Sequence, residues 1–414
     1  MTPLKRRFYE PFLPTVNQYK HLFDALEYAG ARPIFVGGCV RDVILGRAFI
    51  DIDIEVYNVS QERLESLLKD IGGFQYTGRA FGVYRKGHLE IALPRLEIKT
   101  GTKHTDFDIK INPHLSFEKA AIRRDLTINA MGYDWFGNQF LDPFDGLIHC
   151  QNKVLEAVNQ DTFREDELRA LRVAQFIGRL QFEPTDALER LCATAKLGAL
   201  SKERIGTELR KLLWKSEVPS KGFNFLEKTE LIKQLFLEKY ALEQRSAFYQ
   251  FCDLIGAQPT GLLKEKGVYS ALFWYAPSDT TWLQAELVSL GFFKKDVIWG
   301  LHTNSWLQQL TAETAAVAGF HEALYQLDLL GVGLEEAAGL IKALTGTEAL
   351  VERIQAVDPY LLIPKVQAVD LIDAGVVPGP AMAKYIKTAR LVQFQEPDLS
   401  KAALLNRILG GIKI

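Results

Sequence analysis

Three acidic side chains alternate with aliphatic ones in the segment from Asp51 to Val56. In an extended strand this alternation places Asp51, Asp53 and Glu55 on one face and the aliphatic residues on the other. Two carboxylates at this spacing can share one or two Mg²⁺ ions, whose shell is normally completed by substrate phosphates. The alternative is a strand with a solvated polar face. Glu90, in a second candidate strand, is either a third metal ligand or half of a cross-strand ion pair.

A glycine turn precedes this segment. The β-rich run Pro33–Val36 leads into Gly37 and Gly38, and a short helix that contains Arg41 follows. Glycines allow a phosphate to approach the backbone, and a helix N-terminus favours anions. An ordinary strand-to-helix turn is the alternative. The turn and the Asp-x-Asp strand together predict metal-assisted transfer from a nucleoside triphosphate.

A pair of arginines follows at Arg123 and Arg124, with Asn129 five residues beyond the second. The guanidinium groups could bind a triphosphate, and the amide could contact a sugar or the backbone. Equally, the three residues could form a surface charge pair with a capping asparagine.

A third polar group has helical spacing. Asp166, Arg169 and Arg172 lie at i, i+3 and i+6, on adjoining parts of one helix face. Surface ion pairs are one interpretation. The other is base reading, because a carboxylate can accept from the exocyclic amino group of cytosine or adenine while a guanidinium donates to the adjacent ring nitrogen. Uracil and guanine present the opposite pattern at these atoms.

The elements that must position these groups fall into two classes. Residues 1–150 mix helices with strands. The helices are expected at 16–28 and, capped by Ser60, at 60–71, and the strands at 33–36, 51–56, 81–85 and 89–93. Helical periodicity dominates from about 151 onward, with helices expected first at 165–180, 185–195 and 202–215. The 414 residues suggest two to four domains. An α/β head followed by a long all-helical region is therefore predicted.

The amino-acid composition limits the kinds of partner and compartment that we expect. Lys and Arg number 49 and Asp and Glu 51, so the net charge is −2 and any RNA must be held by a local basic patch. No apolar run approaches the length of about 18 residues that spans a membrane, and no secretory signal pattern is present. The four cysteines are scattered, which suggests a reducing compartment. We expect a cytoplasmic protein with no membrane contact and no obligate protein partner.

The motifs Gly37-Gly38-x-Val40-Arg41-Asp42, Asp51-x-Asp53, Arg123-Arg124-Asp125 and Glu165-Asp166-x-x-Arg169, in this order, resemble the class II CCA-adding tRNA nucleotidyltransferase and bacterial poly(A) polymerase family. The resemblance covers roughly residues 30 to 180. It implies an α+β fold, with a nucleotidyltransferase-type β-sheet head followed by an elongated all-α neck, body and tail. We expect their boundaries at 1–150 for the catalytic head, 151–215 for the nucleotide-reading neck, 216–330 for the body and 331–414 for the tRNA-binding tail.

The resemblance also implies roles for the motif residues. Asp51 and Asp53 would be catalytic and hold Mg²⁺, and Asp166 and Arg169 would read the base. The remaining nucleotide-binding residues would be Gly37, Gly38, Arg41, Arg123, Arg124, Asn129 and Arg172. Gln175 stands where many family members have another arginine.

Two further regions carry expectations. The polar stretch from Arg95 to Asp106 is expected to be a mobile loop of the kind that in this family accompanies addition of the terminal A; its marker residues are Arg95, Lys99, Gly101 and His104. A long surface loop is the alternative. Phosphate contacts to RNA are expected from Lys202, Arg204, Arg210 and Lys211, although a solvated helix face would carry the same residues.

The sequence therefore predicts a CCA tRNA nucleotidyltransferase. It would add C, C and A from CTP and ATP to the 3′ end of tRNA and bind the acceptor stem by its shape. An A-adding enzyme and a poly(A) polymerase are the nearest alternatives. A non-catalytic RNA-binding protein is an alternative from another class, and the presence of both Asp51 and Asp53 argues against it.

Overall fold

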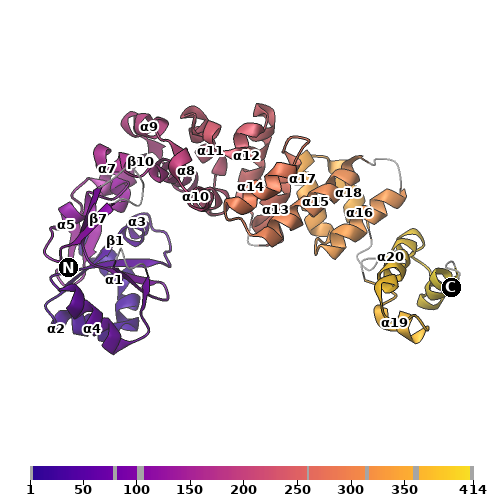
Figure 1. The fold of residues 1–414 in the computed structure, drawn as a ribbon, viewed down its shortest axis with the longest axis horizontal. Helices are drawn as coiled ribbons and strands as arrows, with labels where there is room; N and C mark the ends of the chain where they lie inside the picture. The colour runs from indigo at the N-terminus through magenta and orange to yellow at the C-terminus, as the bar shows by residue number, and fades with distance from the viewer. Residues whose placement is uncertain are drawn as a thin grey trace. The chain divides into compact units, whose positions relative to one another are not determined.

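The chain divides into two compact units. The computed structural model describes residues 3–77, 82–99, 107–258, 261–312, 317–357 and 363–410. The first unit comprises Met1–Leu209 and Lys221–Leu235, and the second comprises Arg210–Ser220 and Phe236–Ile414. Strands occur in the first unit, whereas the described part of the second is helical (Figure 1). The α/β head that the sequence predicts is thus confirmed. The remainder is mostly helical in its described part, but two short strands, β10 (Val154–Leu155) and β11 (Glu183–Pro184), lie beyond residue 150.

A seven-stranded mixed sheet organises the head. Its strand order is β3-β4-β5-β2-β1-β8-β9. The pair β2–β5 is parallel and the other neighbours are antiparallel. The strands are β1 (Arg32–Val36), β2 (Ile52–Tyr57), β3 (Gln75–Thr77), β4 (Val83–Lys86), β5 (Leu89–Ala92), β8 (Gly132–Asp134) and β9 (Gln139–Leu141).

The register gives the sheet one apolar and one polar row. Tyr133, Phe35, Ile54, Ile91 and Tyr84 are successive partners across the strands. These residues are all buried. In the next row, Val36 is the partner of Asp53, Asp53 of Glu90, and Glu90 of Arg85. Because paired residues project to the same face, the carboxylates lie together on the face opposite Tyr84.

Helices cover the sheet as its sequence pattern requires, with one difference at the N-terminus. Ser60 caps α4 (Gln61–Ile71) by accepting from the Arg63 amide, as predicted. The single helix expected from residue 16 is instead two, α1 (Pro3–Gln18) and α2 (Lys20–Tyr28). The expectation was wrong because α1 contains two prolines inside it and α2 begins only after Tyr19, which has a non-helical ψ of 33°.

The stretch expected to be a loop, from Arg95 to Asp106, begins in a strand that belongs to a hairpin. Strands β6 (Arg95–Lys99) and β7 (Phe107–Ile111) pair antiparallel, with Arg95 opposite Ile111 and Lys99 opposite Phe107. The loop expectation was therefore wrong for 95–99. The physical reason is that polar and aliphatic residues alternate there, which favours a strand, and Leu96 packs against a buried cluster of the head. Gly101 and His104 lie outside the described residues.

Short helices and two small strands complete the first unit, and α10 runs from it into the second. They are α3 (Gly38–Ile44), α5 (Phe117–Ala121), η1 (Thr127–Asn129), α6 (Gly146–Asn152), β10 (Val154–Leu155), α7 (Gln160–Arg164), α8 (Leu168–Leu180), β11 (Glu183–Pro184), α9 (Asp186–Ala193), η2 (Leu197–Ala199), α10 (Lys202–Lys215), α11 (Pro219–Lys228) and η3 (Leu231–Gln234). The helices expected at 165–180, 185–195 and 202–215 are thus present with small shifts at their ends.

The second unit continues with helices alone in its described part. They are η4 (Phe236–Lys239), α12 (Leu242–Gly256), α13 (Leu262–Trp274), α14 (Thr281–Ser289), α15 (Lys294–Ala312), α16 (Val317–Leu329), α17 (Leu334–Thr345), α18 (Glu348–Gln355), α19 (Ala368–Asp373), α20 (Pro380–Gln395) and α21 (Lys401–Gly410). The last three share a small core of their own around Leu371, Ala389 and Leu404. Among the described helices, none is both long enough and apolar enough to cross a membrane.

Candidate active site

The two aspartates of the predicted metal strand differ in their surroundings. Asp51 precedes β2, is exposed, and lies 3.3 Å through Oδ1 from Nδ1 of His88. Asp53 lies within β2 and is half-buried beside Glu90 in the register. Burial is the main reason that the pKa of Asp53 is raised to about 6. The Arg124 guanidinium lowers this pKa, whereas the negative charges of Glu90 and Asp51 raise it further. The site is therefore locally rich in negative charge.

The cross-strand ion pair that the sequence offered as one alternative for Glu90 is present, and its role as a third metal ligand stays a prediction. Glu90 is adjacent to Asp53, and its Oε1 also lies 3.4 Å from Nε of Arg85 on the neighbouring strand. No three acidic, cysteine or histidine side chains gather as a ready-made metal site within the described ranges. The structure thus brings Glu90 beside the aspartates without completing a three-ligand cluster.

The glycine turn lies directly against the carboxylate strand. Gly37 has φ +74°, a backbone conformation that residues with a Cβ rarely adopt. A Cβ built there would be 3.0 Å from Nη1 of Arg124 and 3.7 Å from Oδ2 of Asp53. Helix α3 starts at Gly38, so its N-terminal amides begin beside Asp53. The turn that the sequence predicts is thus placed where it and the carboxylates can act on the same ligand.

The third acidic residue of the strand has a different role from the first two. Glu55 is buried, and its Oε1 accepts from Nη2 of Arg124 at 2.9 Å and Nη2 of Arg123 at 3.0 Å. Burial alone would raise the pKa of Glu55, but the two arginines outweigh it, so this pKa is lowered. Sequence reasoning placed Glu55 on the carboxylate face without a function. Its period-two spacing from Asp53 was the only local signal.

A buried polar network connects the glycine helix with α8. Arg41 donates through Nη1 to Oδ1 of Asn129 at 2.7 Å, and Asn129 donates through Nδ2 to Oδ1 of Asp125 at 3.1 Å. Asp125 also accepts from Nε of Arg172 at 2.8 Å and from the Leu126 amide at 2.8 Å. Burial favours the neutral acid, but Arg172, Asn129 and Arg169 together outweigh it and hold the pKa of Asp125 well below its usual range.

Three residues that we predicted to contact the nucleotide, Arg41, Asn129 and Arg172, belong to this buried network. Arg41 and Asn129 are buried, with 3% and 5% of their surface exposed, and each already has protein partners. Arg41 and Arg172 also lie over the ring of Phe176, at 5.3 and 5.7 Å from its centroid. These contacts fix the positions of the three side chains. Direct nucleotide contact by Arg41, Asn129 or Arg172 stays a prediction.

The predicted base-reading pair lies at the start of α8 and is held by other residues. Asp166 accepts through Oδ1 and Oδ2 from Nη2 of Arg204, at 3.1 and 2.9 Å, and through Oδ1 from the Leu168 amide. Arg169 donates through Nη1 to the carbonyl of Thr162 and through Nη2 to that of Arg123. The second contact joins the helix of the base reader to the arginine pair beside Glu55.

Comparisons with known proteins find relatives of part of this chain. Residues 34–156 match the family described as the poly A polymerase head domain. The chain is 38% identical over 216 residues to a multifunctional CCA protein of Mannheimia succiniciproducens, which is 50% of this chain and 50% of that protein. It is 38% identical over 212 residues to a CCA-adding enzyme of Pseudomonas putida, 49% of this chain and 55% of that enzyme.

Over part of its length, the chain is therefore similar to poly A polymerase head domains and to CCA-adding enzymes. The matches span only about half the length of these curated relatives. The fold is similar over a longer range. A CCA-adding enzyme of Thermotoga maritima in complex with tRNA aligns with TM-score 0.67 at 18% identity, over 97% of this chain and 96% of its own. One of Bacillus stearothermophilus in complex with CTP aligns with TM-score 0.66 at 21% identity, over 99% and 98%.

The donor set fits a divalent metal ion, which nucleotidyltransferases generally use. Asp51 and Asp53 supply carboxylate oxygens, which are hard ligands of the kind that Mg²⁺ prefers. One or two protein carboxylates suffice for such an ion when substrate phosphates complete its shell. The arrangement of two aspartates, without a three-residue cluster in the described part of the chain, is consistent with that division of ligands.

Four residues that we expected to contact RNA have intramolecular neighbours. Arg204 pairs with Asp166, and Arg210 donates to the carbonyl of Leu290 at 2.8 Å while its guanidinium lies 5.5 Å from the Phe292 ring centroid. Lys202 is exposed and Lys211 is half-buried. Their contacts with RNA stay predictions, and Arg204 gains a second expected role as a residue that positions Asp166.

Gln175, which replaces a common arginine of the family, is buried on α8 with 3% of its surface exposed. Its Nε2 atom finds no hydrogen-bond acceptor within the described ranges. The position therefore faces the interior of the first unit and not its surface.

Of the expected loop residues, Arg95 is half-buried in β6 and Lys99 ends that strand.

Proposed function

We propose that the chain is a CCA tRNA nucleotidyltransferase. The observation that supports this most directly is the placement of Asp53 and Arg124 beside Gly37 in the turn. A nucleoside triphosphate bound there would have its phosphates at the backbone turn and its α-phosphate near the aspartates. The relatives named as CCA-adding enzymes support the same assignment for the part of the chain that they cover.

In the proposed reaction the terminal 3′-hydroxyl oxygen of tRNA attacks the α-phosphorus of CTP or ATP. A new bond forms between this oxygen and the phosphorus, the bond to the bridging oxygen of the β-phosphate breaks, pyrophosphate leaves, and the hydroxyl proton is released to solvent. Mg²⁺ held by Asp51 and Asp53 would supply positive charge to the phosphates and favour the deprotonated hydroxyl. Arg123 and Arg124 would be held by Glu55 at the edge of the same site and add fixed positive charge.

Base choice is assigned to Asp166 and Arg169. The carboxylate would accept from the amino group of cytosine or adenine, and the guanidinium would donate to the neighbouring ring nitrogen. Arg204 holds Asp166 and the carbonyls of Thr162 and Arg123 hold Arg169, so neither side chain must order itself when the base arrives. A buried hydrogen bond left unmade costs about 1–3 kcal/mol. Two wrong contacts with uracil therefore give roughly 100-fold discrimination or more.

Repeated addition of A is a second candidate, because the matching head family is named for poly A polymerase. A-only addition to a tRNA that already ends in CC is a third. In all three, the substrates are the tRNA or RNA 3′ end and the nucleoside triphosphates.

We assign the protein to the cytoplasm, since its four cysteines are buried free thiols.

The deciding experiment supplies purified full-length protein and Mg²⁺ with tRNAs that end before CCA, after C and after CC, each with one nucleotide at a time. A CCA-adding enzyme incorporates C, C and A in order and then stops. Long A tails would favour the poly(A) polymerase, and A addition to the CC substrate alone would favour the A-adding enzyme. Asp53→Ala must lose all addition, whereas Asp70→Ala, an exposed aspartate on α4, must retain it. Full activity of Asp53→Ala would refute the assignment.

A further inference from the structure

A pocket lies on the face of the head sheet opposite the carboxylates. Its volume is about 520 Å³, and it opens between α4 and strands β3 and β4. Tyr84 lines it and belongs to the apolar row of the sheet, whereas Asp53 and Glu90 belong to the row that faces the other way. Volumes of 300–1,000 Å³ are typical of small-molecule sites. The pocket is therefore separate from the proposed active site.

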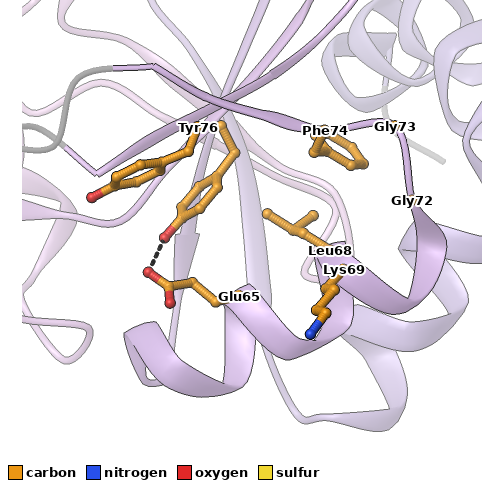
Figure 2. Close-up of a pocket in the computed structure, with 8 residues that line it drawn as sticks. Glu65, Leu68, Lys69, Gly72, Gly73, Phe74 and Tyr76 are labelled. Atoms are coloured by element: carbon orange, nitrogen blue, oxygen red, sulfur yellow. Dashed lines mark hydrogen bonds between the residues drawn. The ribbon is translucent and has the colours of Figure 1, made fainter.

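Aromatic side chains form its walls. Figure 2 shows Tyr76 on one side of the opening and Phe74 above Leu68 on the other. The rings of Tyr76 and Tyr84 are 5.1 Å apart between centroids, and 43% of the surface of Tyr76 is exposed. Every nucleobase has a flat π-face that stacks on such rings, so this wall suits a base of any sequence.

The polar groups come from one face of α4. Glu65 and Lys69 are spaced i, i+4 and both line the pocket, yet no ion pair joins them. Glu65 accepts through Oε1 from the Tyr84 hydroxyl at 2.7 Å and from Nε2 of Gln61 at 2.9 Å. Within the described residues, Oε2 accepts no hydrogen bond. A fixed carboxylate with one available oxygen thus stands beside an exposed ammonium group.

The segment at the end of α4 lines the pocket and fixes the position of Phe74. Gly72 and Gly73 both have positive φ, 73° and 77°, and turn the chain back toward β3. Lys86 donates through Nζ to the Gly72 carbonyl at 2.8 Å and lies 5.4 Å from the ring centroid of Phe74. A Cβ at Gly73 would be 3.0 Å from Cε of Lys86. The backbone and Lys86 therefore fix Phe74, so this wall is formed before any ligand binds.

We propose that this pocket binds a nucleobase that carries an exocyclic amino group, together with its phosphate. The base stacks on the Tyr76 wall, its amino group donates to Oε2 of Glu65, and Lys69 meets the phosphate. Uracil has no amino donor and presents carbonyl oxygens, so the carboxylate disfavours it. A free nucleotide and an unpaired base of a bound RNA present the same chemistry. The proposal does not depend on the activity assigned to the carboxylate face.

Photolabelling with peptide mapping tests the proposal on the full chain. One arm uses 8-azido-AMP, and the other uses a short single-stranded oligoadenylate with 8-azidoadenine. We expect label in the peptide that covers residues 61–77, competed by AMP at least about fivefold better than by UMP. Label from the first probe alone identifies a free nucleotide as the ligand, and label from the oligonucleotide alone identifies RNA.

Two pairs of variants make the test specific. Tyr76→Ala should lower labelling about tenfold or more, because the stacking wall is lost. Tyr28→Ala removes a tyrosine that is 90% exposed elsewhere in the head and should change nothing. Glu65→Gln should remove the preference for AMP over UMP, whereas Glu62→Gln on the same helix should keep it. No label at 61–77, or equal labelling of Tyr76→Ala and the wild type, would overturn the proposal. Far-UV circular dichroism checks that each variant is folded.

Discussion

Removal of the Asp125 carboxylate should destabilise the head more than any exposed ion pair does. Asp125 is 7% exposed and is the acceptor for two nitrogens of Arg172, at 2.8 and 2.7 Å, for Nδ2 of Asn129 and for the Leu126 amide. Asp125→Ala leaves all four donors without this acceptor. Breaking a buried pair costs about 3–5 kcal/mol, and the partial exposure of Arg172 favours the lower end, about 3 kcal/mol.

The pH dependence provides a second readout of the same carboxylate. The pKa of Asp125 is lowered in the folded state from its ordinary value of about 3.9. A group with a lowered folded pKa contributes stability above its unfolded pKa and loses it as the pH falls through the folded pKa. The difference in unfolding free energy between the wild type and Asp125→Asn should therefore be constant from about pH 5 to 8 and shrink below about pH 4.

The assay must read the head separately, because a chain of two compact units need not unfold in one step. Urea titration followed by hydrogen–deuterium exchange of peptides from residues 117–134 does so. Asp161→Ala is the matched control, since its carboxylate is 95% exposed and lies 3.5 Å from Arg164, and exposed pairs contribute little. If Asp125→Ala and Asp161→Ala shifted the urea midpoint equally, the buried network would have no special role in stability.

The remaining predictions concern the turn, the base reader and the hairpin. Gly37→Ala places a Cβ at a position with positive φ, 3.0 Å from Nη1 of Arg124. The variant should therefore have a lower melting temperature and no nucleotide addition. Wild-type turnover would show that the turn tolerates a side chain. Arg204→Ala should reduce selection of CTP over UTP in single-nucleotide incorporation, because Asp166 loses the hydrogen bonds that hold it. An unchanged ratio of CTP to UTP incorporation would leave Arg204 with a role in RNA binding only. Deletion of Gly101–Thr105, which retains β6 and β7, should leave a tRNA product that ends in CC. An equal loss of A and C addition would contradict this.

Local sequence was sufficient for the elements that carry the chemistry. The alternation from Asp51 to Val56 predicted the strand, and Gly37 and Gly38 predicted the turn before a helix, because each depends only on residues a few positions apart. Ser60 predicted the start of α4 for the same reason: a capping side chain bonds to an amide three residues away. The motif order also predicted the similarity of residues 34–156 to the poly A polymerase head domain, because the motifs depend on residue types at set spacings in the sequence.

Tertiary structure alone decided which of these residues became partners. Glu55 meets Arg123 and Arg124 across 68 and 69 residues, and Asp166 meets Arg204 across 38. No local period specifies such pairs, because they form only when strands and helices distant in sequence pack together. The parallel pairing of β2 with β5 likewise placed Glu90 beside Asp53, and the same register put Tyr84 on the opposite face, where its pocket lies away from the carboxylates. The sequence names the groups that can do chemistry, and the packing of the sheet determines which of them share a site, since each strand presents alternate residues to opposite faces.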